Sequence, residues 1–200
     1  MSIPKTCLAF FVFVATALHA RSSEVTNIPE IGAHQPILIV EKNVNPQNKM
    51  VVYTKLDAHG HIIADGNRPL LDFYWLMDGK NYKPVHAKIK NEIHKRLTGQ
   101  WSSKDRAHFI VNLNDLKEVK CDIKEPRMDV YVRKTHHGMN VEAQMTLGPS
   151  DGNMRIKLSS IYTEGRAFPA AVYAVTLKGE KIVNGSPTGK KVTRKYDSAN

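Results

Sequence analysis

Apolar and polar residues alternate along much of the second half of the chain. The alternation runs through residues 109–113, 128–133, 139–147 and 154–158. Successive side chains of a β-strand point to opposite faces, so this period of two predicts strands with one buried and one wet face. Turn-forming residues at 137–138 and 148–152 separate these strands. Ser159 and Ser160 interrupt the alternation, which predicts a β-bulge.

Apolar runs in the rest of the chain predict further strands. Residues 36–41 and 50–56 flank an Asn-rich turn at 43–48, and together they predict a hairpin. Residues 70–77 are the most apolar run and carry large side chains on both faces, which favours a position inside a sheet. Residues 170–177 predict another apolar strand near the C-terminus.

One segment has the period of a helix. Its apolar residues recur every four positions and would form one stripe: Val85, Ile89, Ile93 and Leu97. Pro84 suits the first turn of a helix and Gly99 suits a helix end. We therefore expect an amphipathic helix at about 84–98 that packs its stripe on the sheet.

These elements predict a mainly β protein, an antiparallel β-sandwich or small barrel with one packed amphipathic helix. The spacing of the strands leaves the choice between sandwich and barrel open. The length suits a single domain. We place this β-rich domain at residues 36–195, between an irregular lead-in at 21–35 and a frayed tail at 196–200.

The first 20 residues are expected to be a secretory signal peptide. Lys5 precedes an apolar core at residues 7–18, which is shorter than the roughly 20 apolar residues of a membrane span. Small residues allow cleavage after Ala17 or Ala20, and the polar residues that follow favour Ala20. The mature protein would be secreted or periplasmic, and loss of Lys5 would lower the formal net charge of +10 by one.

Cys121 would then be the one cysteine of the mature chain, because Cys7 leaves with the signal peptide. An intrachain disulfide could not form. The alternation around Cys121 predicts that its thiol points inward, as is common for a free cysteine. An intermolecular disulfide is the alternative.

Short motifs in the first half of the domain resemble those of an exported family known only as a domain of unknown function. They are the stretch from Glu41 to Tyr53, then Pro69, then Asp72-Phe73-Tyr74-Trp75. The family shares an Asn-rich hairpin that ends in Val-x-Tyr, followed by Pro and a Tyr-Trp strand. Residues 173–179 are similar to its last strand. The resemblance implies an exported β domain over most of residues 36–185, and it implies no activity, ligand or site residue.

Basic residues gather in two parts of the chain. Eight Lys and Arg residues stand against two acidic residues between Lys80 and Arg106. The tentative ligand-binding residues of this surface are Lys88, Lys95, Lys104, Arg106, Tyr82 and Trp101. The second cluster consists of Lys178, Lys181, Lys190, Lys191, Arg194 and Lys195. Basic surfaces attract anionic polymers and membranes, although charge that only keeps the protein soluble explains the clusters equally well. Anionic lipid or polysaccharide is the expected partner, with peripheral membrane contact, and nucleic acid is not expected without a recognised motif.

His59-x-His61 is the best candidate for a metal site. On a strand both imidazoles would share one face, and a third ligand could come from elsewhere in the chain, for example from Asp57. Zinc needs three or four such ligands, and solvated loop histidines are the alternative. The chain has no Gly-x-Ser-x-Gly elbow and no phosphate-binding loop. We therefore name no catalytic residue and expect no cofactor.

The sequence favours a non-enzymatic exported protein that binds an anionic or amphiphilic ligand of the envelope or the extracellular space. A hydrolase without a recognisable motif and a structural envelope protein are the alternatives. Converging polar groups in a pocket would favour the enzyme, and a dry apolar cavity would favour a lipid carrier. A flat basic face would favour association with the envelope.

Overall fold

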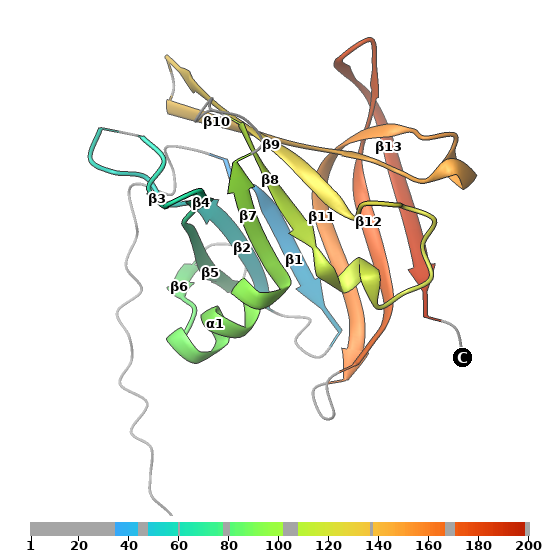
Figure 1. Ribbon diagram of the computed structural model, residues 1–200, viewed down its shortest axis with the longest axis horizontal. Helices are drawn as coiled ribbons and strands as arrows, with labels where there is room; N and C mark the ends of the chain where they lie inside the picture. The colour runs from blue at the N-terminus through green and yellow to red at the C-terminus, as the bar shows by residue number, and fades with distance from the viewer. Residues whose placement is uncertain are drawn as a thin grey trace, which may run out of the picture.

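Long strands make up most of the protein (Figure 1). The structure is a computed structural model and describes residues 35–43, 48–59, 61–77, 81–101, 108–136, 138–166 and 171–198. The predicted signal peptide and most of the predicted lead-in lie outside these residues. The strands of the first half are β1 (Leu38–Lys42), β2 (Asn48–Thr54), β3 (Ala64–Asp65), β4 (Arg68–Pro69), β5 (Leu71–Met77), β6 (Asn81–Pro84) and β7 (Leu97–Trp101). Those of the second half are β8 (His108–Leu113), β9 (Arg127–Thr135), β10 (Gly138–Thr146), β11 (Arg155–Arg166), β12 (Ala171–Val183) and β13 (Ser186–Asp197).

Helix α1 (Ala87–Arg96) is shorter than the sequence predicts. Pro84 ends strand β6, and the ring of His86 caps the helix by accepting a hydrogen bond from the Lys88 amide. Gly99 does not end the helix, because the chain passes at Leu97 directly into β7. A Cβ at Gly99 would meet the Pro69 ring at 3.4 Å, an ordinary van der Waals contact, so neither packing nor a helix end requires glycine here.

Eleven strands form one large mixed sheet, and β11 is its branch point. Its first residues, 155–157, pair with β10, and residues 160–163 pair in parallel with β1. The predicted bulge lies at this change of partner, between Leu158 and Ser160. Strand β12 covers the other edge of β11 and pairs in turn with β13. The sheet is therefore mixed, because the β1–β11 pair is parallel, whereas the other pairs of described strands are antiparallel, as the sequence predicts.

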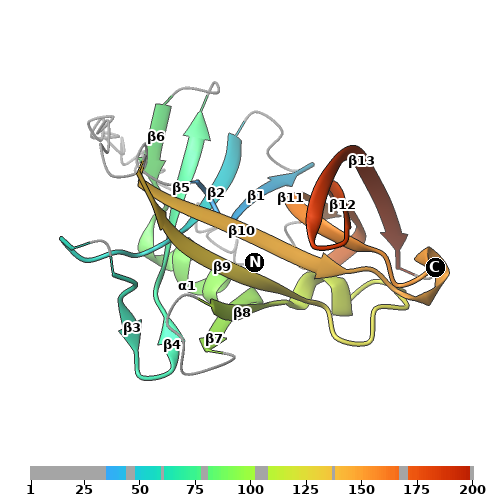
Figure 2. The same cartoon turned by 90° about the horizontal axis from the view of Figure 1, so that it is seen from above.

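The branch gives the sheet two arms that lie over one another (Figure 2). One arm has the order β10-β9-β8-β7 and the other β1-β2-β5-β6. The main core fills the space between them, with fully buried Phe109 and Val130 from one arm and Leu38 and Phe73 from the other. The mainly β prediction is confirmed, and the arrangement is sandwich-like. Among the described strands the sheet does not close into a barrel.

Two 3₁₀ turns, η2 (Asn114–Lys117) and η3 (Pro149–Asp151), complete the regular structure. Cys121 is half-buried against the core, and its thiol donates a hydrogen bond to the Leu116 carbonyl. This agrees with the inward direction that the sequence predicts. None of the described helices has the length and apolar character needed to cross a membrane.

Candidate binding surface: a basic face and a polar cleft

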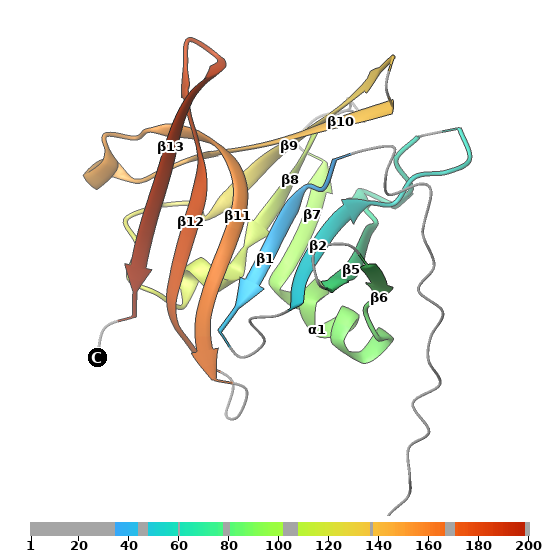
Figure 3. The same cartoon turned by 180° about the vertical axis from the view of Figure 1, so that it is seen from behind.

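A basic face lies on the outer side of β11, β12 and β13. We define it by four side chains that point the same way: Arg155, Lys157, Lys178 and Lys191. Lys157 lies opposite Glu180, and Glu180 lies opposite Lys191, in one row across the three strands. Arg155 and Lys178 are two residues away from this row along their strands, so they share its face. These three strands lie in front in Figure 3.

The four cations of the basic face have no ion-pair partner in the described part of the chain. The neighbouring carboxylate, that of Glu180, accepts a hydrogen bond from the Gly189 amide. Lys195 is different, because it pairs with Glu164 at 3.1 Å and with Asp197 at 3.5 Å. Hydrogen bonds to those carboxylates raise the pKa of the Lys195 ammonium. The basic face is thus a set of four cations without an ion-pair partner among the described residues, with the single carboxylate of Glu180 beside them.

The sequence of the β12–β13 hairpin explains why these lysines share one side. Asn184 and Gly185 both have positive φ, at 51° and 79°, which is the backbone of a two-residue turn that suits twisted strands. Gly179 lies so close to the Lys157 carbonyl that a Cβ would collide with it. Both features fix the register that brings Lys157 and Lys191 into one row.

A polar cleft of about 440 Å³ adjoins the basic face. The two meet at Thr146, which lines the cleft and lies directly opposite Arg155. Segment 122–129 forms one wall and segment 146–153 the other. The residues that line the cleft are Asp122, Ile123, Lys124, Glu125, Arg127, Asp129, Thr146, Leu147, Gly148, Pro149 and Asn153. Most of them offer hydrogen-bond donors or acceptors to a ligand.

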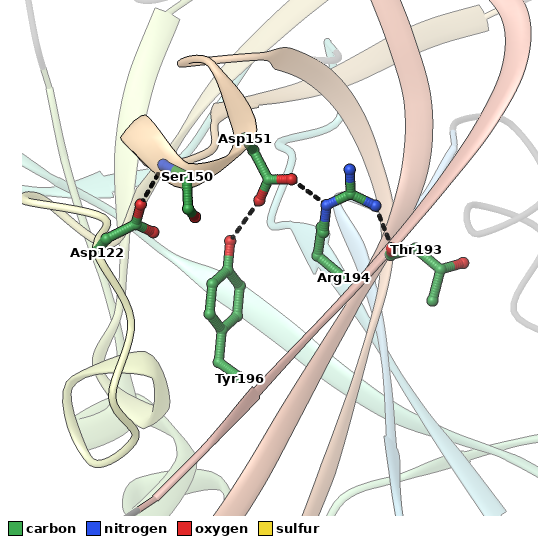
Figure 4. A network of polar contacts seen from close by, with 6 residues as sticks. All are labelled: Asp122, Ser150, Asp151, Thr193, Arg194 and Tyr196. Atoms are coloured by element: carbon green, nitrogen blue, oxygen red, sulfur yellow. Dashed lines mark hydrogen bonds and ion pairs between the residues drawn. The ribbon is translucent and has the colours of Figure 1, made fainter.

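Hydrogen bonds and an ion pair hold the cleft wall at 146–153 in place (Figure 4). The Ser150 amide donates to the Asp122 carboxylate at 2.6 Å, and this bond lowers the pKa of Asp122. Asp151 accepts from the Arg194 guanidinium and, at 3.5 Å, from the Tyr196 hydroxyl. Burial raises the pKa of Tyr196, and the Asp151 charge adds to the effect. These contacts attach η3 to strand β13.

Most charged side chains of the cleft are already paired. Arg127 binds Glu125 at 2.7 Å, and His108 lies 3.1 Å from Asp129 and stacks on the Tyr131 ring. His108 and Asp129 form a His–Asp pair of the kind that acid–base chemistry uses. The structure places no serine or cysteine nucleophile in the lining of this cleft.

The structure describes part of the basic surface predicted between residues 80 and 106, and ligand binding there stays a prediction. Lys88 is exposed on α1, whereas the side chain of Lys95 and the whole of Lys104 and Arg106 lie outside the described residues. Tyr82 packs in a small cluster on the outer side of β2 and β5. Trp101 packs edge-on against Phe109 at 5.8 Å, in the main core. The two aromatic rings therefore belong to separate clusters and do not frame one surface.

His59 and His61 lie in an exposed turn organised by Asp57. The Asp57 carboxylate accepts hydrogen bonds from both histidine amides at 2.8 Å and contacts the His61 ring at 3.2 Å. The amide bonds, that of His61 first, lower the pKa of Asp57. In the described residues no three His, Cys, Asp or Glu side chains come together as metal ligands. Metal binding at His59 and His61 stays a prediction.

Sequence reasoning found half of the basic face. Lys178 and Lys191 belong to the C-terminal basic cluster, but Arg155 and Lys157 were read only as the polar positions of an alternating strand. Their alternation with the apolar Ile156 could have predicted this position, since it places both cations on the solvent-exposed face of the strand. The cleft could not be found in this way, because its walls come from two separate segments on either side of the β9–β10 hairpin.

Comparisons of the chain with protein-family models, with curated proteins and with solved structures find no match. The resemblance to the exported family therefore stays a prediction.

Proposed function

We propose that the protein is an exported binding protein that attaches to an acidic polysaccharide through the basic face. The observation that carries this proposal is the basic face, whose four cations have no ion-pair partner among the described residues and lie on one side of β11–β13. One carboxylate, that of Glu180, lies between Lys157 and Lys191. A polymer with regularly spaced carboxylates can contact several of these cations at once. Their separate attractions then add.

The polar cleft favours a polysaccharide over a lipid headgroup. It adjoins Arg155 through Thr146 and offers hydroxyl, amide and ammonium groups from Thr146, Asn153 and Lys124. Sugar hydroxyls can use such donors and acceptors, whereas a membrane surface would engage the cations alone. The proposed complex has acidic groups on the basic face and neutral hydroxyls in the cleft.

Removal of charge from the basic face tests the proposal. Binding of sodium alginate is measured for the native protein and for the triple variant Arg155→Gln, Lys157→Gln, Lys191→Gln. The matched control is Lys55→Gln, Lys83→Gln, Lys88→Gln, which removes the same charge from exposed positions on other elements. Each cation near an anionic surface contributes about 1 kcal/mol, so the first variant should bind roughly a hundredfold more weakly. The control should bind nearly as well as the native protein.

Two further ligands separate the alternatives. Neutral dextran should not bind, and vesicles of phosphatidylglycerol should bind more weakly than alginate, because they cannot use the cleft. Equal losses in the two triple variants would show that only net charge matters and would contradict the proposal. Tighter binding to the vesicles would favour membrane association instead.

A further inference from the structure

Strand β13 ends the sheet on one side, and its outer edge has no neighbouring strand. It is 12 residues long and pairs with β12, and no other described strand pairs with it (Figure 3). The unpaired N–H and C=O groups of such an edge are a template for one more strand. Extended peptides bind to proteins in this way, by strand addition. The edge is therefore a candidate interaction surface separate from the polar cleft.

The register of β13 shows which of its backbone groups point away from β12. In an antiparallel pair, residues that exchange hydrogen bonds with the partner alternate with residues whose N–H and C=O groups point outward. The Ser198 amide donates to the Tyr173 carbonyl, so Ser198 faces β12. The Asp197 carbonyl points the other way, because it accepts from the Lys120 amide at 3.1 Å. By this alternation the outward residues of β13 are Lys191, Thr193, Lys195 and Asp197.

Lys191, Thr193 and Lys195 offer these outward groups to a ligand. No hydrogen bond joins their amides to another segment of the described chain. The Thr193 carbonyl accepts from the Arg194 guanidinium at 2.9 Å (Figure 4), and a carbonyl has a second acceptor site. The side chains of all three residues are exposed. An added strand would therefore find three amides and three carbonyls in one line.

The side chains along this edge select the chemistry of the partner. Lys191 and Lys195 lie on the outer side of the sheet, whereas Val192 and Tyr196 are buried on the inner side. Successive side chains of an added strand would alternate between these two sides. Acidic residues on its outer side would face the lysines, and apolar residues on its inner side would adjoin Val192.

A second copy of the chain fits this edge poorly. Antiparallel pairing of two β13 strands about Thr193 would place Lys191 of each copy opposite Lys195 of the other. Like charges directly opposite one another destabilise a strand pair. The lysines thus disfavour self-association and favour an acidic partner.

We propose that the outward edge of β13 binds an extended peptide segment in which acidic and apolar residues alternate. The peptide backbone extends the sheet by one strand, and its carboxylates face Lys191 and Lys195. This activity goes beyond polysaccharide binding and does not depend on it, since the edge shares only Lys191 with the basic face.

Amide hydrogen exchange of the native protein, measured by NMR, tests the proposal with the peptide acetyl-Thr-Glu-Val-Glu-Val-Glu-Thr-amide. Excess peptide should slow exchange at the Lys191, Thr193 and Lys195 amides about tenfold or more, because these amides then lie in a ladder that must open before they exchange. The amides of Val192 and Arg194 already face β12 and should change little. A peptide of the same composition with its three glutamates adjacent should give no protection.

Two results of this experiment would overturn the proposal. One is unchanged exchange at the three outward amides in excess peptide, and the other is equal protection by both peptides. Sedimentation velocity of the protein alone provides a further check. A dimer that the Thr193→Pro substitution dissociates would assign the edge to a second copy and would also contradict the proposal.

A matched pair of variants tests the role of the backbone. Thr193→Pro removes an outward N–H, a position at which an edge strand tolerates proline, whereas Thr193→Val keeps that amide and removes only the hydroxyl. Thr193→Pro should weaken binding of the alternating peptide about tenfold, as expected for loss of a backbone hydrogen bond, and Thr193→Val should not. Equal affinities would contradict strand addition. Neither substitution changes a charge, so both variants should bind alginate as the native protein does, which separates this proposal from that of polysaccharide binding.

Discussion

At the scale of single residues, Asp151 is a carboxylate that the fold buries and pairs with two side chains of strand β13. Its side chain is only 7% exposed, and it accepts from both Arg194 and Tyr196 (Figure 4). Burial of a carboxylate costs free energy unless hydrogen bonds or ion pairs satisfy its oxygen atoms. Here the partners come from β13, 43 and 45 residues away in the chain. The contact therefore joins the cleft wall to the last strand.

Asp151→Ala should destabilise the protein by about 2 kcal/mol. The substitution removes the carboxylate that accepts hydrogen bonds from Tyr196 and Arg194. Because Arg194 is half-exposed, the loss of stability stays below that for a fully buried ion pair. Urea denaturation measures the change. Asp197→Ala is the control, because its carboxylate is 66% exposed and meets Lys195 only at 3.5 Å. That surface contact should contribute less than about 1 kcal/mol. Equal effects of the two substitutions would show that Asp151 has no special role.

At the scale of elements, α1 shows how far a periodic pattern can be trusted. Val85, Ile93 and Leu97 of the predicted stripe are buried, but Ile89 is 44% exposed. The helix begins at Ala87 and Leu97 already belongs to β7, so the four residues do not share one helical face. The pattern predicted the burial of Val85, Ile93 and Leu97 correctly, but it was wrong for Ile89 and for both ends of the helix, because the pairing of β6 and β7 with distant strands is not visible in a local pattern.

Truncation of the two isoleucines separates the predicted stripe from the observed one. Ile93→Ala should lower the free energy of unfolding by about 2–5 kcal/mol, the usual cost for a buried isoleucine. Ile89→Ala should lower it by less than about 1 kcal/mol, since the side chain is largely exposed. Chemical denaturation of both variants provides the comparison. A large loss for Ile89→Ala would mean that the helix is rotated from the position described.

The strands were easier to predict than their partners. The alternation around Ile156 and Val130 identified strands and faces, because a period of two follows directly from backbone geometry. The bulge before Ser160 was also visible as a break in phase. The parallel pairing of β1 with β11 was not predicted, since it joins Val40 to Ile161 across more than 100 residues. Local patterns carry no information on such distant partners.

At the scale of the whole molecule, the branched sheet creates three different environments. The space between the arms holds the core, and the outer side of β11–β13 holds the basic face. The segments at the start of β9 and at the end of β10 enclose the polar cleft. The sequence predicts a basic protein with an anionic partner and names tentative binding residues between Tyr82 and Arg106, which stay a prediction. The fold brings Lys157 and Lys191 together through strand pairing, which composition alone could not show.

The central claim is that acidic polysaccharide binds on the basic face and in the adjoining cleft. Amide hydrogen–deuterium exchange of the protein with and without alginate oligosaccharides tests it most directly, because it locates the contact without any substitution. We predict slower exchange in residues 146–163 and 176–195, with residues 81–101 unchanged. Protection confined to residues 81–101, or the absence of any protection at saturating oligosaccharide, would contradict the proposal.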